Sequence, residues 1–419
     1  MSITTTNVWK NIAMITRTAL EGVHNNTEMG RRVARRWDGD FKGSGRIGNT
    51  LSIRKPAVFK TRTGPVAQPN GYVDTYSQVQ LNQVGVDMEI TSAELSLNVD
   101  DFSSNVLDNL VLALVQKFDL DILAATSCAT SVDGRGFNQF AGSVGTSIST
   151  MSPFLQAKSF METQSASPFD NKVSAMFNPF VAANTIMGQT GYYHPGDVIS
   201  ENYKKGDLGD LAGLHVFTSS NTPALTLGTW SGTIVYSSGA TDGGNTITVS
   251  GMTGTFAPGE HFSINGVQAV NPQGFAVQPE LKEFEVVSQS GSVITFFPAM
   301  SLTGTYQNVN ALPTGSAAIY AWGSGNATAA AASALPAGTG QTVRRSLVFH
   351  EDSLALCIAD LEDVNDGGGY SKRMKDDKTG LRIRSTIWYD GLNDKKIFRL
   401  DALYGAAVLR EGFGADVIQ

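Results

Sequence analysis

The clearest helical pattern of apolar residues lies at about residues 102–127. Its apolar side chains recur at intervals of three and four, the spacing of one stripe along a helix: Leu107, Leu110, Val111, Leu114, Val115, Phe118 and Ile122. The charged residues between them, among them Asp119 and Asp121, are predicted to lie on a polar face. A single apolar stripe predicts a helix with one side packed on a sheet.

Two shorter helices are predicted where a capping residue precedes a proline, at Ser152-Pro153 and at Asn178-Pro179. A serine or asparagine side chain accepts a bond from the first helical turn, and a proline at the first helical position loses no helical hydrogen bond. The second pair follows the apolar run VSAMF, residues 173–177, so a strand followed by a helix is predicted there.

Residues 45–90 contain two strand-like segments, NTLSIRKPAVFKTRT and SQVQLNQVGVDMEI, around a centre rich in turn residues. We expect a long hairpin. Its apolar residues are sparse and Pro56 interrupts its first strand, so it needs a partner surface, which we expect on another subunit. Gly43, Gly45 and Gly48 match G-x-G-x-x-G, but a strand follows them, so a hinge is favoured over a dinucleotide site.

Charged residues become rare between Thr222 and Val343, where there are 6 in 122 residues, against 63 in the other 297. Strand segments such as NTITVS, EHFSING, EFEVVS and SVITFFP alternate there with Gly and Pro turns, which predicts a small antiparallel β-barrel or sandwich inserted into a host domain. The segment GSGNATAAAASALPAGTGQ, downstream, is expected to be a linker. The last segment is predicted to form strands joined by a turn at 391–395, and SKRMKDDK, residues 371–378, to be a solvated loop.

The net charge of −7 gives the chain no global attraction to nucleic acid, so tight DNA binding is not expected. Residues 31–62, by contrast, carry ten basic side chains and two acidic ones. Two interpretations stay open: a solvated face, or an arm whose charge meets an acidic neighbour. On the second interpretation, the candidate contact residues of the arm and the hairpin are Arg35, Arg36, Arg46, Arg54, Lys55, Lys60 and Arg62.

The sequence lacks the common catalytic motifs G-x-x-x-x-G-K-[ST], H-E-x-x-H, C-x-x-C and G-x-S-x-G. Its five histidines show no ligand spacing, and Cys128 and Cys357 fit no disulfide or zinc pattern, which favours a reducing compartment. We therefore predict no catalytic, cofactor or metal site. Without a signal-peptide pattern or a run of 18 apolar residues, neither export nor a membrane span is expected.

The order of these features resembles that of tailed-phage coat proteins with the Hong Kong 97-type (HK-97) fold. Residues 1–42, 43–90 and 102–127 look like the N-terminal arm, the extended loop and the spine helix of that family. Three segments are similar to the short-tailed Salmonella phage subtype, which carries an insertion domain: MFNPFVAA, GLHVFTSSNTP and TITVSGMTGTFAPGEHFSINGVQAV.

The resemblance implies an α+β capsid fold with an inserted all-β barrel. Its implied parts are the arm (1–42), the extended loop (43–90), a peripheral domain with the spine helix (91–150), an axial domain (151–221), the inserted barrel (222–343) and the returning axial and peripheral strands (344–419). In the family a charged loop of the insertion bridges capsomers; the corresponding SSGATDGGN offers only Asp242. Some relatives crosslink through a loop lysine, and Lys55 and Lys60 lie in that region.

The resemblance further implies a structural protein and not an enzyme, without cofactors. Copies would assemble in the host cytoplasm into pentamers and hexamers of an icosahedral virion shell, as a precursor that expands when double-stranded DNA is packed. A separate scaffolding protein and a portal protein are the expected partners, with weak DNA contact and no membrane. Two alternatives stay open: a tail, decoration or adhesion protein with a receptor-binding β-domain, and an enzyme whose site assembles only in space.

Overall fold

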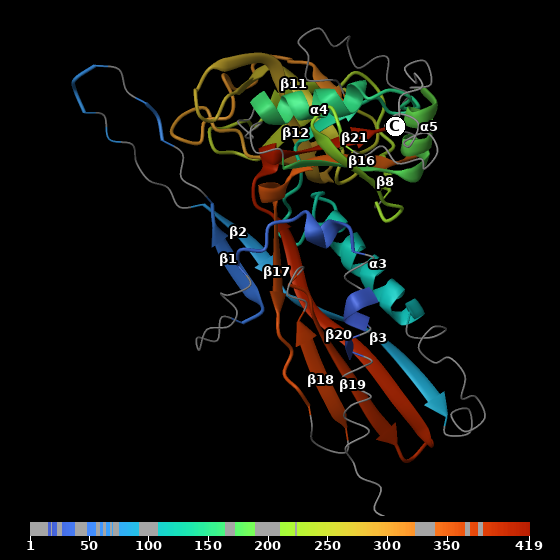
Figure 1. The fold of residues 1–419 in the computed structure, drawn as a ribbon. Helices are drawn as coiled ribbons and strands as arrows, with labels where there is room; N and C mark the ends of the chain where they lie inside the picture. Colours follow the sequence, from blue (N-terminus) through green and yellow to red (C-terminus); the bar gives the residue numbers. More distant parts are fainter. Residues whose placement is uncertain are drawn as a thin grey trace, which may run out of the picture. The chain divides into compact units, whose positions relative to one another are not determined.

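The computed structural model describes residues 16–17, 19–22, 27–37, 48–55, 59–61, 64–67, 69, 75–91, 108–163, 172–188, 210–222, 224–322, 340–364, 369–375 and 380–419. Helices and strands are mixed in an α+β arrangement (Figure 1). The chain forms two compact units, each described by itself below. Unit 1 comprises Met1–Ser52, Gln78–Ile122 and Ala355–Ala406, and unit 2 comprises Ile53–Ser77, Leu123–Leu354 and Ala407–Gln419.

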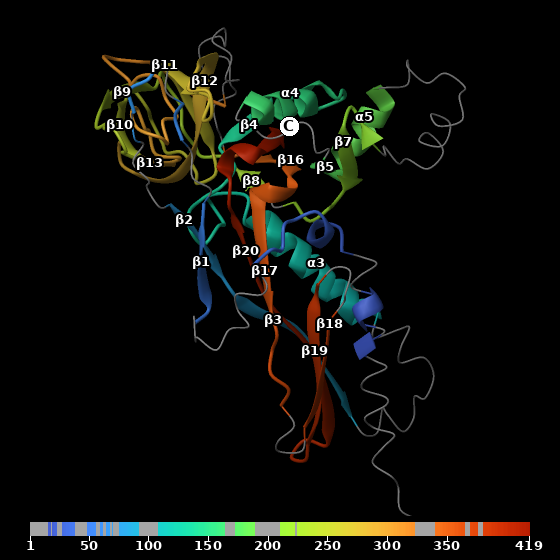
Figure 2. The ribbon, with the colours of Figure 1, turned by 60° about the vertical axis from the view of Figure 1, so that its left-hand side comes forward.

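Unit 1 contains a five-stranded sheet and one long helix (Figure 2). The strands are β17 (Leu354–Ala359), β20 (Lys395–Val408), β19 (Arg382–Asp390), β18 (Tyr370–Lys375) and β3 (Asn82–Thr91). The helix α3 (Asp108–Ala124) buries the predicted apolar stripe from Val111 to Ile122, and its Phe118 ring lies 4.7 Å from the Tyr404 ring of β20. The predicted helix with one packed side is confirmed for these residues; 102–107 lie outside the described part.

The predicted hairpin of residues 43–90 is wrong for its last part, from Asn82 onward. Strands β1 (Thr50–Arg54) and β2 (Tyr76–Gln80) do pair with each other, but β3 pairs with β20 over ten residues of the same unit. Its alternating Val84, Val86 and Met88 stand opposite Ala402, Leu400 and Phe398. Alternation predicts a strand but does not identify its partner, so the prediction that this segment depends on another subunit fails for β3.

Two predictions about charged segments are also wrong. Asp119, expected on a polar face, is buried, and its Oδ2 accepts a hydrogen bond from Glu28 N at 3.3 Å. Residues 371–375, expected in a solvated loop, belong to β18, where Ser371 is buried opposite Thr386. Basic residues are common on edge strands because they discourage pairing with other chains, which explains why the charge pattern was misleading here.

One sheet of unit 2 has six strands, in the order β4 (Gln139–Gly142), β21 (Gly414–Ile418), β16 (Arg345–His350), β5 (Val173–Phe177), β7 (Leu214–Thr218) and β6 (Asp210–Leu211). We call it the host sheet. Helices α4 (Ser152–Thr163) and α5 (Pro179–Gly188) begin at the predicted positions. Phe154 of α4 stacks on Phe177 at 3.9 Å, and Asn178 Oδ1 accepts from Phe180 N, as expected of a cap.

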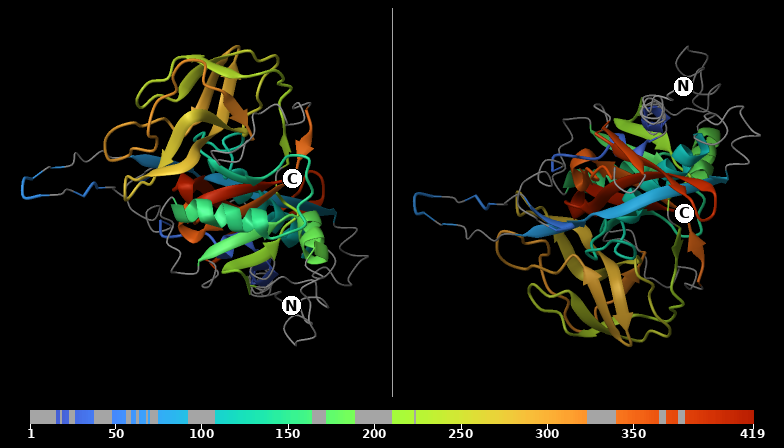
Figure 3. Two further views of the ribbon diagram at one scale, coloured as in Figure 1. Left: turned by 90° about the horizontal axis from the view of Figure 1, so that it is seen from above. Right: turned by 90° about the horizontal axis from the view of Figure 1, so that it is seen from below.

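A second six-stranded sheet of unit 2, the insert sheet, comes entirely from the segment that is poor in charge (Figure 3). Its antiparallel strands are, in order, β14 (Ile319–Ala321), β11 (His261–Val270), β12 (Val277–Ser290), β13 (Val293–Phe297), β10 (Thr246–Ser250) and β9 (Val235–Ser238). Phe262, Phe284 and Phe296 meet in its core, with ring centres 4.9 to 5.7 Å apart. The four predicted strand segments are confirmed.

The insert sheet does not form a compact unit of its own. Its buried cluster also contains Phe140 and Ile418 of the host sheet. The short strands β8 (Leu225–Thr226) and β15 (Thr342–Val343) pair near the two ends of the segment. The boundaries at 222 and 343 stay predictions, and the linker residues 323–339 lie outside the described part. The remaining short elements are the 3-10 turns η1 (Met29–Arg31), η6 (Glu351–Ser353) and η7 (Glu411–Phe413).

Candidate functional site

The loop between β1 and β2 belongs to unit 2 and is anchored at its base by other residues of that unit. Lys55 N donates to Thr75 O at 2.8 Å, which closes the hairpin at the base of the loop. On one leg, Lys55 Nζ lies 2.6 Å from Glu411 Oε2. On the other leg, Ser77 Oγ donates to Val408 O at 2.6 Å and is buried. Both legs are thus held by the end of β20 and by the turn η7 that follows it; we call these contacts the loop root.

The ion pair of the loop root is partly shielded from water, with the Lys55 side chain 14% and the Glu411 side chain 31% exposed. Burial would raise the pKa of Glu411, but the Lys55 ammonium outweighs burial and lowers this pKa to about 2. Glu411 is therefore ionised at any pH at which the protein is expected to work. A charge-assisted contact of this kind fixes the direction in which the loop leaves the sheet.

Beyond the root, the described residues of the loop expose apolar side chains. Phe59 is 58% exposed and Val66 is 73% exposed. Lys60 Nζ donates to Gln307 Oε1 at 3.2 Å and lies 4.4 Å from the ring centre of Phe275. Figures 1 and 3 show the described parts of this loop, in blue, reaching away from both sheets of unit 2.

Five of the seven predicted basic contact residues lie in the described part of the chain, where Lys60 contacts Gln307 and Phe275 beyond the loop root. Arg54 and Lys55 lie together at the loop root, Arg54 with its guanidinium 5.9 Å from the Tyr76 ring centre. Arg35 and Arg36 follow Ala34, which bridges to Ala355 at the start of β17 within unit 1. Arg46 and Arg62 lie outside the described residues. Lys55 and Lys60 already have partners in their own chain, so a role for any of these residues between subunits stays a prediction.

Asp242, the candidate residue of the insertion loop, is engaged by its own chain. Its two carboxylate oxygens accept from Leu302 N and from Thr303 Oγ1, each at 2.7 Å. These bonds, led by the one from Leu302, hold the pKa of Asp242 below its usual value. The geometry gives Asp242 the role of joining two turns of the insert sheet, and its predicted contact with another capsomer stays untested.

The sequence reasoning missed a cluster of buried charges where the insert sheet meets the host sheet. Glu285 Oε1 of β12 accepts from Ser127 Oγ at 2.9 Å and from Cys128 N at 2.8 Å. Glu283 Oε2 of the same strand accepts from Phe140 N at 2.9 Å. Both carboxylates are buried, so β12 is tied to the host by bonds that water does not screen.

On the host side of this cluster, Arg345 and Asp416 form a buried ion pair. Arg345 donates Nε at 3.1 Å and Nη2 at 2.8 Å to the two oxygens of Asp416. His261 of β11 faces the same carboxylate, with Nε2 3.4 Å from Oδ2. Burial would raise the pKa of Asp416, but the Arg345 charge lowers it overall. We call His261, Glu283, Glu285, Arg345 and Asp416 the joint cluster.

One signal in the sequence was able to reveal this cluster. The segment 222–343 holds only six charged residues, yet Lys282, Glu283 and Glu285 stand almost together in one strand. The structure buries all positions from Leu281 to Val286. Carboxylates in such a strand can be buried when hydrogen bonds satisfy them, as those of Glu283 and Glu285 are here.

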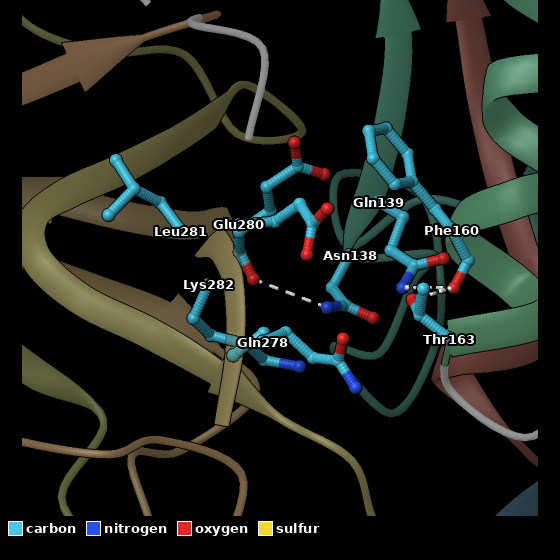
Figure 4. A pocket seen from close by; sticks show the side chains of 10 residues that line it. Asn138, Gln139, Phe160, Thr163, Gln278, Glu280, Leu281 and Lys282 are labelled. Carbon is cyan, nitrogen blue, oxygen red and sulfur yellow. Dashed lines mark hydrogen bonds between the residues drawn. The ribbon is translucent and has the colours of Figure 1, made fainter. Parts of the chain in front are cut away.

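A polar pocket opens beside the joint cluster, between β12, β4 and the end of α4 (Figure 4). Its lining residues include Asn138, Gln139, Gln278, Glu280 and Lys282. Asn138 Nδ2 donates to Glu283 O at 3.2 Å, and Gln139 Nε2 donates to Phe160 O at 3.4 Å. Within the described ranges no group of three or more His, Cys, Asp or Glu residues is placed to hold a metal. No described helix has the length and apolarity to cross a bilayer.

No protein-family model and no curated protein matches the sequence. A solved structure from Mycobacterium phage Che8 is similar at a TM-score of 0.46 and 12% identity, over 94% of this chain and 91% of that one. The capsid of Ralstonia phage GP4 is similar at a TM-score of 0.41 and 10% identity, over 89% of this chain and 83% of that one. The CUS-3 coat protein I-domain is similar at a TM-score of 0.19 and 21% identity, over 22% of this chain and 96% of that one. Since these TM-scores lie below 0.5, the functional interpretation rests on the chain's own elements.

Proposed function

We propose that the chain is the major capsid protein of a tailed phage, with the HK-97-type fold and a β-barrel insertion of the short-tailed Salmonella phage type at 222–343. The observation that carries the proposal is the loop between β1 and β2. It is held at both legs by buried or partly buried contacts, and beyond them Phe59 and Val66 are exposed. A rigidly rooted arm with an apolar end is suited to lie on a neighbouring copy.

The energetics favour many repeated contacts over one strong one. Complete burial of a phenylalanine or valine side chain contributes roughly 1.5–3 kcal/mol. Two such residues per subunit give a weak single contact, but a closed shell repeats that contact in every subunit. Weak contacts allow misplaced subunits to leave during assembly, while closure makes the finished shell stable.

A second exposed apolar face supports assembly with further copies. Helix α5 carries no charged residue, and Phe180, Ala183 and Met187 share its outward side. Phe180 is 61% exposed and Met187 is 70% exposed. Contiguous apolar surface of this kind marks an interaction site in a folded protein. In the proposed shell, α5 of one subunit packs against another subunit of the same pentamer or hexamer.

The proposed partners follow from the same account. The chain would assemble in the host cytoplasm with a separate scaffolding protein and a portal protein, and would become part of the virion. The net charge of −7 fits a container that contacts its packaged double-stranded DNA weakly. No catalytic role or cofactor is proposed.

Assembly of variants tests this function. The purified protein is mixed with its scaffolding protein and followed by sedimentation velocity and negative-stain microscopy. We expect closed shells from the wild type and only small species from Phe59→Ser/Val66→Ser, with an unchanged melting curve. Val277→Ser, at an exposed position of the insert sheet, serves as the matched control and should assemble normally. Fibres or trimers from the wild type would support a tail or adhesion protein instead, and normal shells from the double variant would contradict the role of the loop.

A further inference from the structure

The joint cluster brings five ionisable side chains into a space closed to water. His261, Glu283 and Glu285 come from strands β11 and β12 of the insert sheet, and Arg345 and Asp416 come from β16 and β21 of the host sheet. All five are buried. The rings of Phe140 and Trp322 lie 5.3 and 5.1 Å from the His261 ring, which completes the apolar enclosure.

The charges of this cluster do not balance unless it binds protons. Arg345 and Asp416 neutralise each other at hydrogen-bond distance. Glu285 receives bonds only from the neutral donors Ser127 Oγ and Cys128 N, and Glu283 receives one from Phe140 N. No cation stands among the hydrogen-bond donors of Glu285, so its negative charge would remain unbalanced if His261 were neutral. Buried charge of this kind is costly, so the closed joint favours bound protons.

Two atoms in the cluster show where protons can be bound. Among the described residues, His261 Nδ1 and Glu285 Oε2 have no hydrogen-bond partner. His261 is the group of the cluster that can gain or lose a proton near neutral pH, and Glu285 is the carboxylate that receives hydrogen bonds from neutral donors alone. Protonation at either atom makes the cluster less negative and breaks none of the bonds that hold the two sheets together.

We propose that the joint cluster is a proton-operated latch between the insert sheet and the host sheet: one proton shared by His261 and Glu285 keeps the joint closed, and its loss to water as the pH rises loosens the joint. The bonds that weaken are those from Ser127 and Cys128 to Glu285 of β12, because loss of the proton leaves one unbalanced negative charge that repels the Asp416 carboxylate. The inference concerns a single folded subunit and does not depend on shell formation.

The pKa directions agree with this geometry. Burial raises the pKa of Glu285. Burial lowers the pKa of His261, but its bond to Asp416 and the charges of Glu285 and Glu283 raise it overall above 6.5. A group whose pKa is raised by folding stabilises the fold at low pH, and this contribution is lost as the pH passes the raised value. The joint should therefore loosen on the alkaline side of pH 6.5.

The other titratable groups near the cluster do not reverse this direction. Cys128 stays a neutral thiol because burial raises its pKa. Arg345 keeps its proton because the Asp416 charge outweighs burial. Lys282, whose pKa burial lowers, lines the polar pocket beside the cluster, and its loss of a proton at high pH removes a nearby positive charge and so adds to the loosening.

Hydrogen exchange of the isolated subunit between pH 6.5 and 9.5, corrected for intrinsic exchange, tests the latch. We expect protection of peptides covering 126–140 and 277–290 to fall at least tenfold across this range, while peptides of β3 and β20 keep theirs. Glu285→Gln, which keeps the accepting Oε1 and needs no proton, should remove the fall. The matched control His215→Gln changes an exposed histidine that pairs with Asp210. Its protection should fall with pH as it does in the wild type.

Either of two results would overturn the latch: a flat wild-type profile, or the same fall in Glu285→Gln. If that variant does not fold, ring-labelled histidine in the wild type provides a second test by nuclear magnetic resonance. The His261 signal, assigned by its loss in His261→Gln, should titrate above pH 6.5. A midpoint below pH 6.5 contradicts the proposal.

Discussion

The sheet of unit 1 keeps most of its charges at least partly exposed, with Arg382 and Asp401 as buried exceptions, whereas the insert sheet of unit 2 buries most of its few charges. On the unit 1 sheet, Arg399 pairs with Asp87 at 2.6 Å and Lys395 pairs with Glu89 at 2.9 Å, all on an exposed face. The insert sheet has few charges, and it buries Glu260, Lys282, Glu283 and Glu285. The position of a charge, rather than the number of charges, therefore determines how much a single substitution changes the fold.

The largest expected effect is at the buried pair. Asp416→Ala leaves the Arg345 guanidinium buried without its carboxylate, and breaking such a pair typically costs about 3–5 kcal/mol. We expect a loss of that size in the free energy of unfolding of unit 2, measured by urea denaturation. A loss under about 1 kcal/mol would show that the joint cluster is hydrated and that the contrast between the two sheets is not real.

The loop root should show an intermediate effect that depends on pH. Lys55→Met removes a charge-assisted bond, worth roughly 1.5–3 kcal/mol. Because the pKa of Glu411 is lowered to about 2 in the folded protein, the pair contributes fully above pH 4.5 and is lost as the pH falls toward 2. The stability difference from wild type should shrink over that interval. A difference that is constant from pH 6 to pH 2 would contradict the ion pair.

Helix α3 of unit 1 also buries a carboxylate, that of Asp119, and burial raises its pKa to about 6. Ionising it in the folded state therefore costs free energy above pH 6 and nothing below about pH 4. Asp119→Asn, which keeps an acceptor for Glu28 N, should stabilise unit 1 by about 2 kcal/mol at pH 8. Thermal melts at pH 8 and pH 4 check this; equal effects at both values would exclude the buried carboxylate as the cause.

The smallest effect is expected on the exposed face of the unit 1 sheet. Arg399→Ala removes the pair with Asp87, and exposed ion pairs contribute about 0–1 kcal/mol. Urea denaturation should show a change within that range, and 0.5 M salt should reduce it further. A loss above about 2 kcal/mol would place Arg399 among the structurally essential charges and would weaken the contrast with Asp416.

Local patterns in the sequence predicted the elements better than the contacts between them. The stripe from Val111 to Ile122, the cap at Asn178 and the strands of the insert sheet follow from periodicity and turn chemistry, which act over a few residues. The pairing of β3 with β20 joins residues about 300 positions apart, and the bond between Lys55 and Glu411 joins residues 356 positions apart. Sequence spacing carries no information about such partners, so the basic hairpin residues looked free when two of them were already engaged.

The most direct test of the proposed function is a reconstruction by cryo-electron microscopy of particles assembled from the purified protein and its scaffolding protein. The account predicts a closed icosahedral shell in which Phe59 and Val66 of each subunit are buried against a neighbouring copy. A particle in which the Phe59 and Val66 side chains pack on their own subunit or remain in solvent would contradict it.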